Sequence, residues 1–202
     1  MKMSSQKRDW FDELDSELEK KTSEVIKDVG KKNVIKMHLN TALMEDFLRI
    51  WGRFSKIGVH LTMEPTPTTF ALFDNYPESW KMKEEFDFSE VNSFSLLDTT
   101  QDEGRVGDIL VVNNYSVATV HRFRMSFEFC EGEHYHRYLG WKRHYAKHVL
   151  LETPLDRARL EKVHEVLADI VRVWFESHLR RDREFLVNHI KENYEMVESF
   201  TK

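Results

Sequence analysis

The stretch that decides the fold is residues 117–151, VATVHRFRMSFEFCEGEHYHRYLGWKRHYAKHVLL, which hold the longest strand-like alternation in the chain. Its first part places an apolar side chain at every second position, as an antiparallel strand with one buried face does: Phe123, Met125, Phe127 and Phe129. Glu131-Gly132-Glu133 interrupts this run, and a second run begins at His134. The pattern predicts a β-hairpin with its turn at 131–133.

Other strand-like runs precede this hairpin. Proline donates no ladder hydrogen bond, so Pro65 and Pro67 end one of the runs. Asn113-Asn114 is a turn candidate after another. The segment 78–88 is either a short helix or an irregular excursion. The strands are expected at 34–39, 59–63, 69–73, 91–97 and 109–112.

Three helices are predicted from apolar residues that recur every three or four positions. The first spans residues 9–29 and ends at Gly30, a left-handed cap. The second begins at Asn40 or Thr41 and ends at Gly58. The third begins at Thr153-Pro154, a favourable helix start, and no Gly or Pro occurs in residues 155–202. It is expected to run on through the charged stretch 180–184, where it bends.

Composition limits the class of protein. The 202 residues are 41% hydrophobic and 32% charged, which suits one globular domain with a core. A net charge of −5 argues against a nucleic-acid surface, and no apolar run is long enough to span a membrane. Residues 1–9 are polar, without the apolar segment of a secretory signal, which predicts a cytoplasmic location. Cys130, the lone cysteine, makes no internal disulfide.

These elements predict an α+β fold: a curved antiparallel sheet of about six to seven strands packed on a long C-terminal helix, with an extra N-terminal amphipathic helix. The expected parts are that helix at 1–32, the α+β domain at 33–178 and a helical extension at 179–202. This order of elements resembles the helix-grip fold of START domains and Bet v 1-like proteins over residues 33–178. A cystatin-like or other two-layer sheet with helices on one face is the alternative.

The resemblance implies a cavity between the sheet and the last helix that holds an apolar or amphipathic small molecule. The side chains expected to line it are all large and apolar. The alternative for each of them is ordinary core packing. The candidate ligand-binding residues are Phe70, Phe123, Met125, Phe127, Phe129 and Trp174.

Two histidines of the hairpin are candidate metal ligands. His134 and His136 are two residues apart on a predicted strand, so their rings project from one face. His144 and His148 share that parity if the strand continues unbroken, and Glu133 is adjacent. Two imidazoles and a carboxylate form a known open metal site. The alternative is a set of surface or hydrogen-bonded histidines without metal.

Three functions therefore remain open, and no cofactor follows from any motif. The first is non-catalytic binding of a small molecule between the sheet and the C-terminal helix. The second is an interaction or scaffold role of the terminal helices, including a homodimer. The third is a metalloenzyme that uses His134 and His136.

Overall fold

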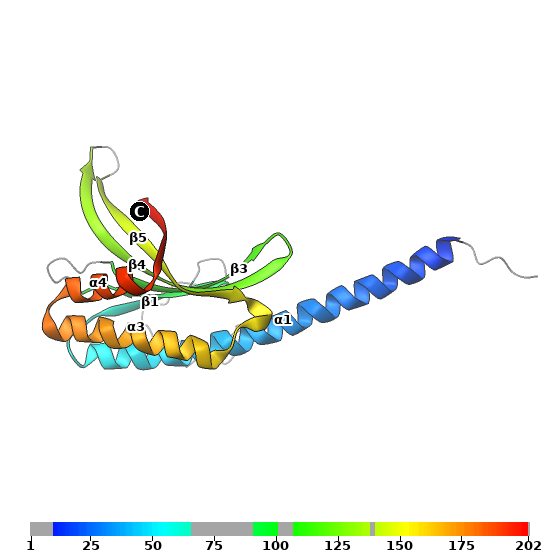
Figure 1. Ribbon diagram of the computed structural model, residues 1–202, viewed down its shortest axis with the longest axis horizontal. Coiled ribbons are helices and arrows are strands. Elements are labelled where there is room, and N and C mark those ends of the chain that lie inside the picture. The colour runs from blue at the N-terminus through cyan, green and yellow to red at the C-terminus, as the bar shows by residue number, and fades with distance from the viewer. Residues whose placement is uncertain (1–9, 66–90, 101–106, 138–139, 202) are drawn as a thin grey trace, which may run out of the picture.

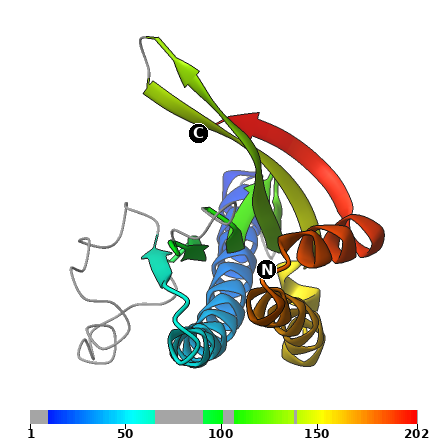
Figure 2. The same cartoon turned by 90° about the vertical axis from the view of Figure 1, so that its left-hand side faces the viewer.

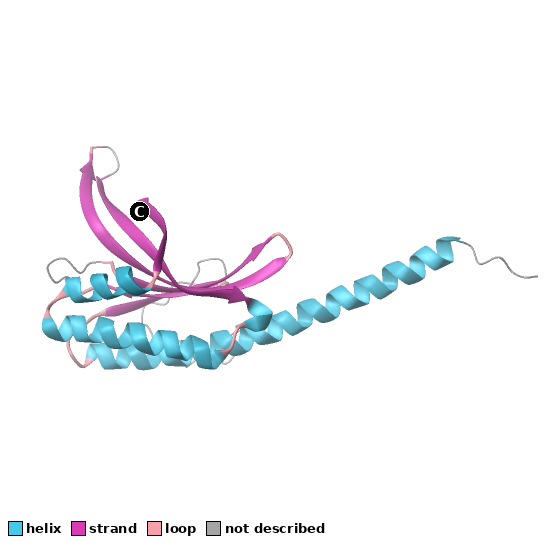
Figure 3. Cartoon of the chain, in the orientation of Figure 1, coloured by secondary structure: helices cyan, strands magenta, loops and turns pink. Residues whose placement is uncertain are grey.

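The computed structural model describes residues 10–65, 91–100, 107–137 and 140–201. A long helix is followed by five strands, a set of C-terminal helices and a last strand, as Figures 1 and 3 show. The bounds are α1 Trp10–Ser55, β1 Leu61–Pro65, β2 Ser93–Asp98, β3 Ile109–Val117, β4 Val120–His136, β5 Gly140–Pro154, η1 Leu155–Arg157, α3 Leu160–Arg180, α4 Arg183–Asn193 and β6 Glu195–Thr201.

The six described strands form one antiparallel sheet whose strand order, β1-β2-β3-β4-β5-β6, is also the order along the chain. The helices form a second layer on one face of this sheet (Figures 2 and 3). The predicted α+β class, with a curved antiparallel sheet packed on helices, is confirmed. The predicted strand at 69–73, with Phe70, and the ambiguous segment 78–88 lie outside the described residues.

The core lies between the two layers. The alternating face of β4 points into it, because Phe123, Met125 and Phe127 are fully buried. Trp174 of α3 packs on Phe127, with ring centroids 5.3 Å apart, and on Phe54 of α1 at 5.0 Å. The second half of α1 and the whole of α3 therefore cover the sheet side by side, as the end-on view in Figure 2 shows.

The β4–β5 hairpin exists, but its predicted turn is wrong. β4 runs past 131–133 to His136, and the turn begins at Arg137. The pairing of β4 with β5 shifts register between Cys130 and Gly132. A β-bulge accommodates an extra residue and bends the strand without ending it, so the glycine that predicts a turn lies at a bulge within β4 instead.

The predicted end of the strand at Val112 is also wrong. Asn113 pairs with Arg124 in the ladder, and β3 continues to Val117. The reversal into β4 occurs at Ala118, whose φ of 53° is the left-handed conformation of a tight turn. Asn114, expected in a turn, is buried in the sheet.

The helix boundary predicted at Gly30 and the strand predicted at 34–39 are both wrong, because α1 is continuous from Trp10 to Ser55. Gly30 lies in open space, since no described neighbouring atom comes within 4 Å of the place that a Cβ atom would occupy there. Lys32 bridges back over it to Asp28 at 2.5 Å, an i,i+4 pair that supports the helix. Gly58, at φ 77°, does follow the end of the helix.

The apolar stripe predicted for the C-terminal helix is confirmed, but both predicted ends of this helix are wrong. Pro154 closes β5, a 3₁₀ turn follows, and α3 begins at Leu160. At Arg181 the backbone reverses with φ 52°, and Asp182 caps α4 by accepting a hydrogen bond from the Phe185 amide at 3.2 Å. The chain after Tyr194 is strand β6, which pairs with β5. An open β5 edge offers a row of unpaired backbone groups, which this last strand satisfies.

Buried polar contacts hold the α3–α4 junction against the sheet. His178 Nε2 lies 3.0 Å from Asp98 Oδ2, and both side chains are almost fully buried. Arg183 donates to Asp108 at 2.8 Å and to the Cys130 carbonyl at 2.6 Å. Burial raises the pKa of the Asp108 carboxyl, against the opposing effect of Arg183. These contacts fix the end of the body at which α1 also terminates.

Candidate interaction surface

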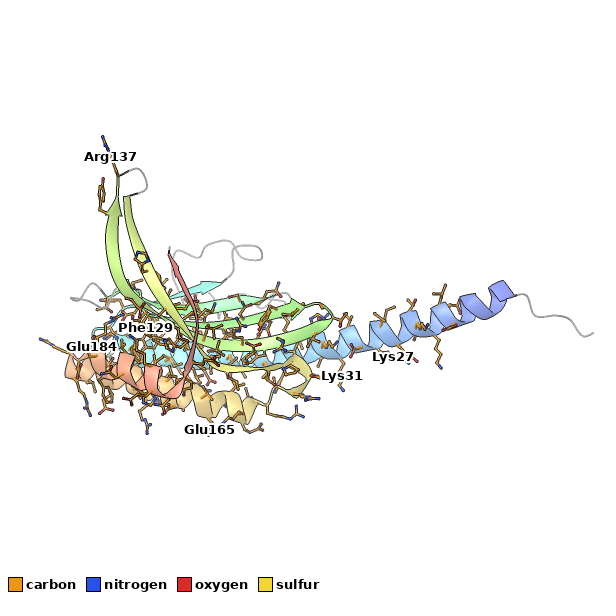
Figure 4. All side chains as sticks on the ribbon, turned by 45° about the horizontal axis from the view of Figure 1, so that its top comes forward. Lys27, Lys31, Phe129, Arg137, Glu165 and Glu184 are labelled. Carbon is orange, nitrogen blue, oxygen red and sulfur yellow. The ribbon has the colours of Figure 1, made fainter. Side chains whose placement is uncertain are left out.

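The first half of α1 projects away from the rest of the protein. We call residues 10–34 the arm; Figure 1 shows it leaving the two-layer body, and Figure 4 shows Lys27 and Lys31 on it. Its described apolar side chains lie open to solvent. Their exposed fractions are 51% for Leu18, 61% for Val25, 65% for Ile26, 45% for Val29 and 60% for Val34.

Three of these side chains continue the core-facing stripe of the same helix. Leu18 and Phe54 are separated by a whole number of 3.6-residue turns, so they share one face of α1. On the body, the stripe is buried under the sheet at Leu43, Phe47, Ile50 and Phe54. On the arm, the same stripe passes through Leu18, Val25 and Val29, and no other described part of the chain covers it.

Charge is divided along the arm. The sequence from 12 to 19 contains five acidic residues and no basic one, whereas residues 27–36 contain four lysines and one acid, Asp28. Ion pairs within the helix, such as Lys21 with Glu17 at 2.6 Å, are solvent-exposed and contribute little to stability. The arm is therefore acidic toward its tip and basic toward its root.

Asparagine side chains connect the root of the arm, where α1 enters the body, to the sheet. Asn40, fully buried in α1, donates to the Val91 carbonyl at 3.1 Å and accepts from Asn114 Nδ2 at 3.0 Å. One turn earlier, Lys36 Nζ donates to Asn92 Oδ1 at 2.8 Å. The Oδ1 atom of Asn114 is buried and has no hydrogen-bond partner among the described residues. These polar contacts connect α1 to β3 at the point where the apolar core ends.

A small pocket lies beside these asparagines; we call it the root pocket. Its volume is about 140 Å³. No carboxylate occurs among its described lining residues, whereas three cationic side chains do. The lining comprises Lys32, Asn33, Lys36, Asn92, Asn114, Tyr115, Ser116, His121, Arg122 and Leu155.

An ion cluster adjoins the root pocket. Glu152 accepts hydrogen bonds from Arg122 at 2.7 Å and from Arg124 at 2.8 Å, and Arg124 also donates to the Tyr115 hydroxyl at 2.6 Å. Burial alone raises a carboxyl pKa, but the hydrogen bonds from Tyr115, Arg124 and Arg122 outweigh it and lower the pKa of Glu152. One carboxylate thus serves two guanidinium groups, and the cluster keeps an excess positive charge.

The predicted ligand-binding residues are brought together at the sheet–helix interface, apart from Phe70, which lies outside the described residues. They contact one another as core residues do and are buried. The indole Nε1 of Trp174 has no hydrogen-bond partner among the described residues, because its surroundings are aromatic. These side chains are Phe123, Met125, Phe127, Phe129 and Trp174.

A separate cleft of about 540 Å³ lies between β5, α3 and the start of β6. Its polar wall contains Asp169, which accepts from the Tyr194 hydroxyl at 3.1 Å and lies 2.8 Å from His189 Nε2. Burial, together with the nearby Asp169 carboxylate, raises the pKa of Tyr194 to about 12. Asp169 itself has a lowered pKa, because the contacts with His189 and Tyr194 outweigh its burial. Its apolar wall is formed by Val149, Leu150, Leu151 and Val166.

The histidines of the hairpin do not share one environment. His144 is exposed, whereas His148 is buried and stacks on Phe129 with ring centroids 5.2 Å apart. The side chains of His134 and His136 are outside the described set, although their backbones belong to β4. Among the side chains that are described, no group of three or more His, Cys, Asp or Glu residues is arranged to hold a metal ion.

Comparison with protein-family models finds no match, and comparisons with curated proteins and with solved structures find none either. In the described part of the chain, no helix combines the length and the apolar character needed to cross a membrane. The assignment of a role therefore depends on the geometry of the arm, the root pocket and the cleft.

Sequence reasoning missed the asparagines at the root. Asn40 was expected as a helix cap and Asn114 as part of a turn, yet both are buried in regular elements. The available signal was the position of Asn40 within the stripe that continues through Leu43 and Phe47. A polar residue on the apolar face of a helix requires a hydrogen-bond partner.

Proposed function

We propose that this protein is an interaction protein that self-associates, with the arms of two copies pairing in antiparallel orientation. The observation that carries the proposal is the exposed apolar stripe of Leu18, Val25 and Val29 on a helix that leaves the body. A lone helix in water is marginally stable, and most helical stability in proteins comes from packing an amphipathic face. A second arm supplies that packing.

The geometry of α1 favours a second chain as the partner that covers the apolar stripe of the arm. The arm is straight in Figures 1 and 4 and points away from the sheet, and the described body reaches it only at its root, beside Lys32 and Asn33. Residues 10–34 span about 38 Å at 1.5 Å per residue. Two such helices provide several turns of mutual contact along one face.

The charge division supports the antiparallel orientation. A parallel pair places the acidic segments 12–19 of both copies together, which is unfavourable. An antiparallel pair with its two-fold axis near Thr22 places residues 12–17 opposite residues 27–32 and Leu18 opposite Ile26. Acidic segments then face basic segments at both ends of the pair.

The oligomeric state of the full chain tests self-association. Light scattering after size exclusion is expected to give twice the chain mass of 24.2 kDa. Val25→Glu is expected to give a monomer, because it places a charge within the stripe. Val34→Glu is the matched control, since Val34 is equally exposed but lies on the opposite face of the helix. A monomeric wild type, or equal behaviour of the two variants, contradicts the proposal.

The orientation is tested separately by distance. A spin label at Lys31→Cys, in a Cys130→Ser background, is expected to give an inter-copy distance of about 30 Å in the antiparallel pair, from 1.5 Å per residue. A parallel pair gives about 10 Å, the usual separation of packed helices. The shorter distance would leave the dimer in place and overturn its orientation.

A second function is favoured by the cleft between β5 and α3. Its apolar strand wall and its polar wall around Asp169 and Tyr194 suit an amphipathic small molecule. Native mass spectrometry of freshly purified protein tests this directly. A mass above that of the bare chain that is lost in Val166→Asp supports the cleft, whereas the bare mass counts against a tightly held ligand.

A further inference from the structure

We propose that the root pocket binds a small organic anion that also carries a hydroxyl or ammonium donor. This inference concerns a different site from the apolar stripe of the arm and does not depend on the pairing of two copies. It follows from three properties of the pocket: a fixed acceptor, a cationic lining and a small volume.

The acceptor is the Oδ1 atom of Asn114. Its orientation is set by a chain of hydrogen bonds, because Asn40 Nδ2 donates to the Val91 carbonyl and so presents Asn40 Oδ1 to Asn114. The amide nitrogen of Asn114 must then face Asn40, and its oxygen is left over. That oxygen is buried, without a partner among the described residues, in a residue that lines the pocket. A buried carbonyl without a donor is costly, so a ligand donor at this position is favourable.

The cationic lining comes from two separate parts of the chain. Lys32 and Lys36 belong to α1, and Arg122 belongs to β4. Arg122 and Arg124 share the single carboxylate of Glu152, so the cluster retains positive charge. His121, whose Nδ1 lies 3.1 Å from the Ser116 hydroxyl, adds a further polar group at the pocket. An anion placed here is attracted by an excess of positive charge, because the nearby carboxylates, Asp28 on Lys32 and Glu152 on Arg122, are fewer than the cationic side chains.

The volume limits the ligand. The pocket has a volume of about 140 Å³. A molecule of the size of a hydroxy acid or an amino acid suits a pocket of this volume. Such a ligand contacts both α1 and the sheet, and it therefore joins the root of the arm to the body.

Three probes of nearly equal size separate the requirement for a negative charge from the requirement for a hydroxyl donor. Lactate carries a carboxylate and a hydroxyl, propionate carries the carboxylate alone, and propane-1,2-diol carries no charge. In ¹H–¹⁵N correlation spectra of the full-length protein, lactate is expected to shift the amide resonances of Asn114, Ser116 and Arg122 and to bind at least tenfold more tightly than propionate. The diol is expected to leave these resonances in place.

Variants locate the site. Arg122→Gln is expected to weaken lactate binding at least tenfold, while Arg49→Gln, an exposed arginine outside the root pocket, leaves it unchanged. Asn114→Ser, which shortens the acceptor, is expected to reduce the preference for lactate over propionate; if it does not fold, the probe series on the wild type still decides. Equal affinity for lactate and propionate, absence of lactate binding, or full binding by Arg122→Gln overturns the inference.

Discussion

The two halves of α1 carry one continuous stripe in two different settings. From residue 39 to 54 the stripe is buried beneath the sheet, with Phe47 and Phe54 at 0% exposure, whereas on the arm Val25 of the same stripe is 61% exposed. α1 is therefore one continuous helix, although only its second half is covered by the sheet. An amphipathic pattern predicts that one face of a helix is covered. Whether the sheet of the same chain covers that face depends on how far the sheet extends along the helix.

The largest expected difference between the halves is in stability. Phe47→Ala is expected to lower the free energy of unfolding by about 3–5 kcal/mol, since it leaves a cavity beside Phe94, whose ring lies 5.2 Å away. Val25→Ala is expected to change it by no more than about 0.5 kcal/mol when the protein is dilute enough to be monomeric. Urea unfolding followed by circular dichroism measures both. Similar losses in the two variants would mean that the arm packs on its own body.

The boundary between the halves is expected to show an intermediate effect. Asn40→Ala removes the partner of the Val91 carbonyl and of Asn114 Nδ2 together, at a cost of about 1–3 kcal/mol for buried groups left unsatisfied. Asn33→Ala, at an exposed position one to two turns earlier, provides the control and is expected to stay within about 0.5 kcal/mol. The same urea titration compares them, and equal stability of Asn40→Ala and the wild type would contradict a structural role for the asparagine chain.

A smaller effect is expected within the arm. Gly30→Ala meets no described neighbouring atom and removes a residue that costs about 0.5–1 kcal/mol in a helix. Since 1.4 kcal/mol is a factor of ten, the pairing of two arms is expected to tighten by roughly two- to fivefold per copy. Sedimentation equilibrium measures the dissociation constant. The control, Gly58→Ala, lies at φ 77° and is expected to destabilise the body instead.

The smallest effect is expected from pH at the root. Because the folded pKa of Glu152 lies below its ordinary value of 4.5, its ion cluster stabilises the protein above that pH and loses its contribution as pH falls through the folded pKa. The contribution is below about 1 kcal/mol, since Arg122 and Glu152 are both partly exposed. Unfolding of the wild type and of Glu152→Gln is expected to differ at pH 7 and to converge in acid. A difference that grows in acid contradicts this assignment.

Local patterns predicted the parts of the fold that depend on one face being buried. The alternation from Phe123 to Phe129 predicted the face of β4, and the spacing from Val163 to Trp174 predicted that of α3. Burial acts on every residue of such a stripe, so the pattern is redundant and survives single exceptions. The α+β class followed from these two faces.

The ends of helices and strands could not be predicted in the same way, because each end depends on a single glycine or proline, and such a residue occurs in more than one kind of local structure. Gly30 was expected to end a helix, and Gly132 to make a turn; in the structure the first lies within α1 and the second at a bulge in β4. Pro154, expected to start a helix, ends a strand. Which use a glycine or a proline takes depends on the neighbours that the remaining chain supplies.

The root pocket was beyond sequence reasoning for a related reason. Its lining comes from α1, the residues before β2, the β3–β4 hairpin and the 3₁₀ turn, and these meet only after the sheet has formed. Asn40 and Asn114 are 74 positions apart. No local spacing of residues predicts a contact between two positions so far apart in the sequence.

The order of the strands has a consequence for the way in which the protein is made. Among the described strands, each one from β2 to β5 pairs with the one before it, so the sheet can extend by one strand at a time as the chain emerges. Hairpins such as β3–β4 close over short loops and form early, because short loops lose little entropy on closure. Among the described elements, β6 pairs with β5 after the two helices α3 and α4 have been synthesised. Strand β6 is therefore expected to complete the sheet after these helices have formed.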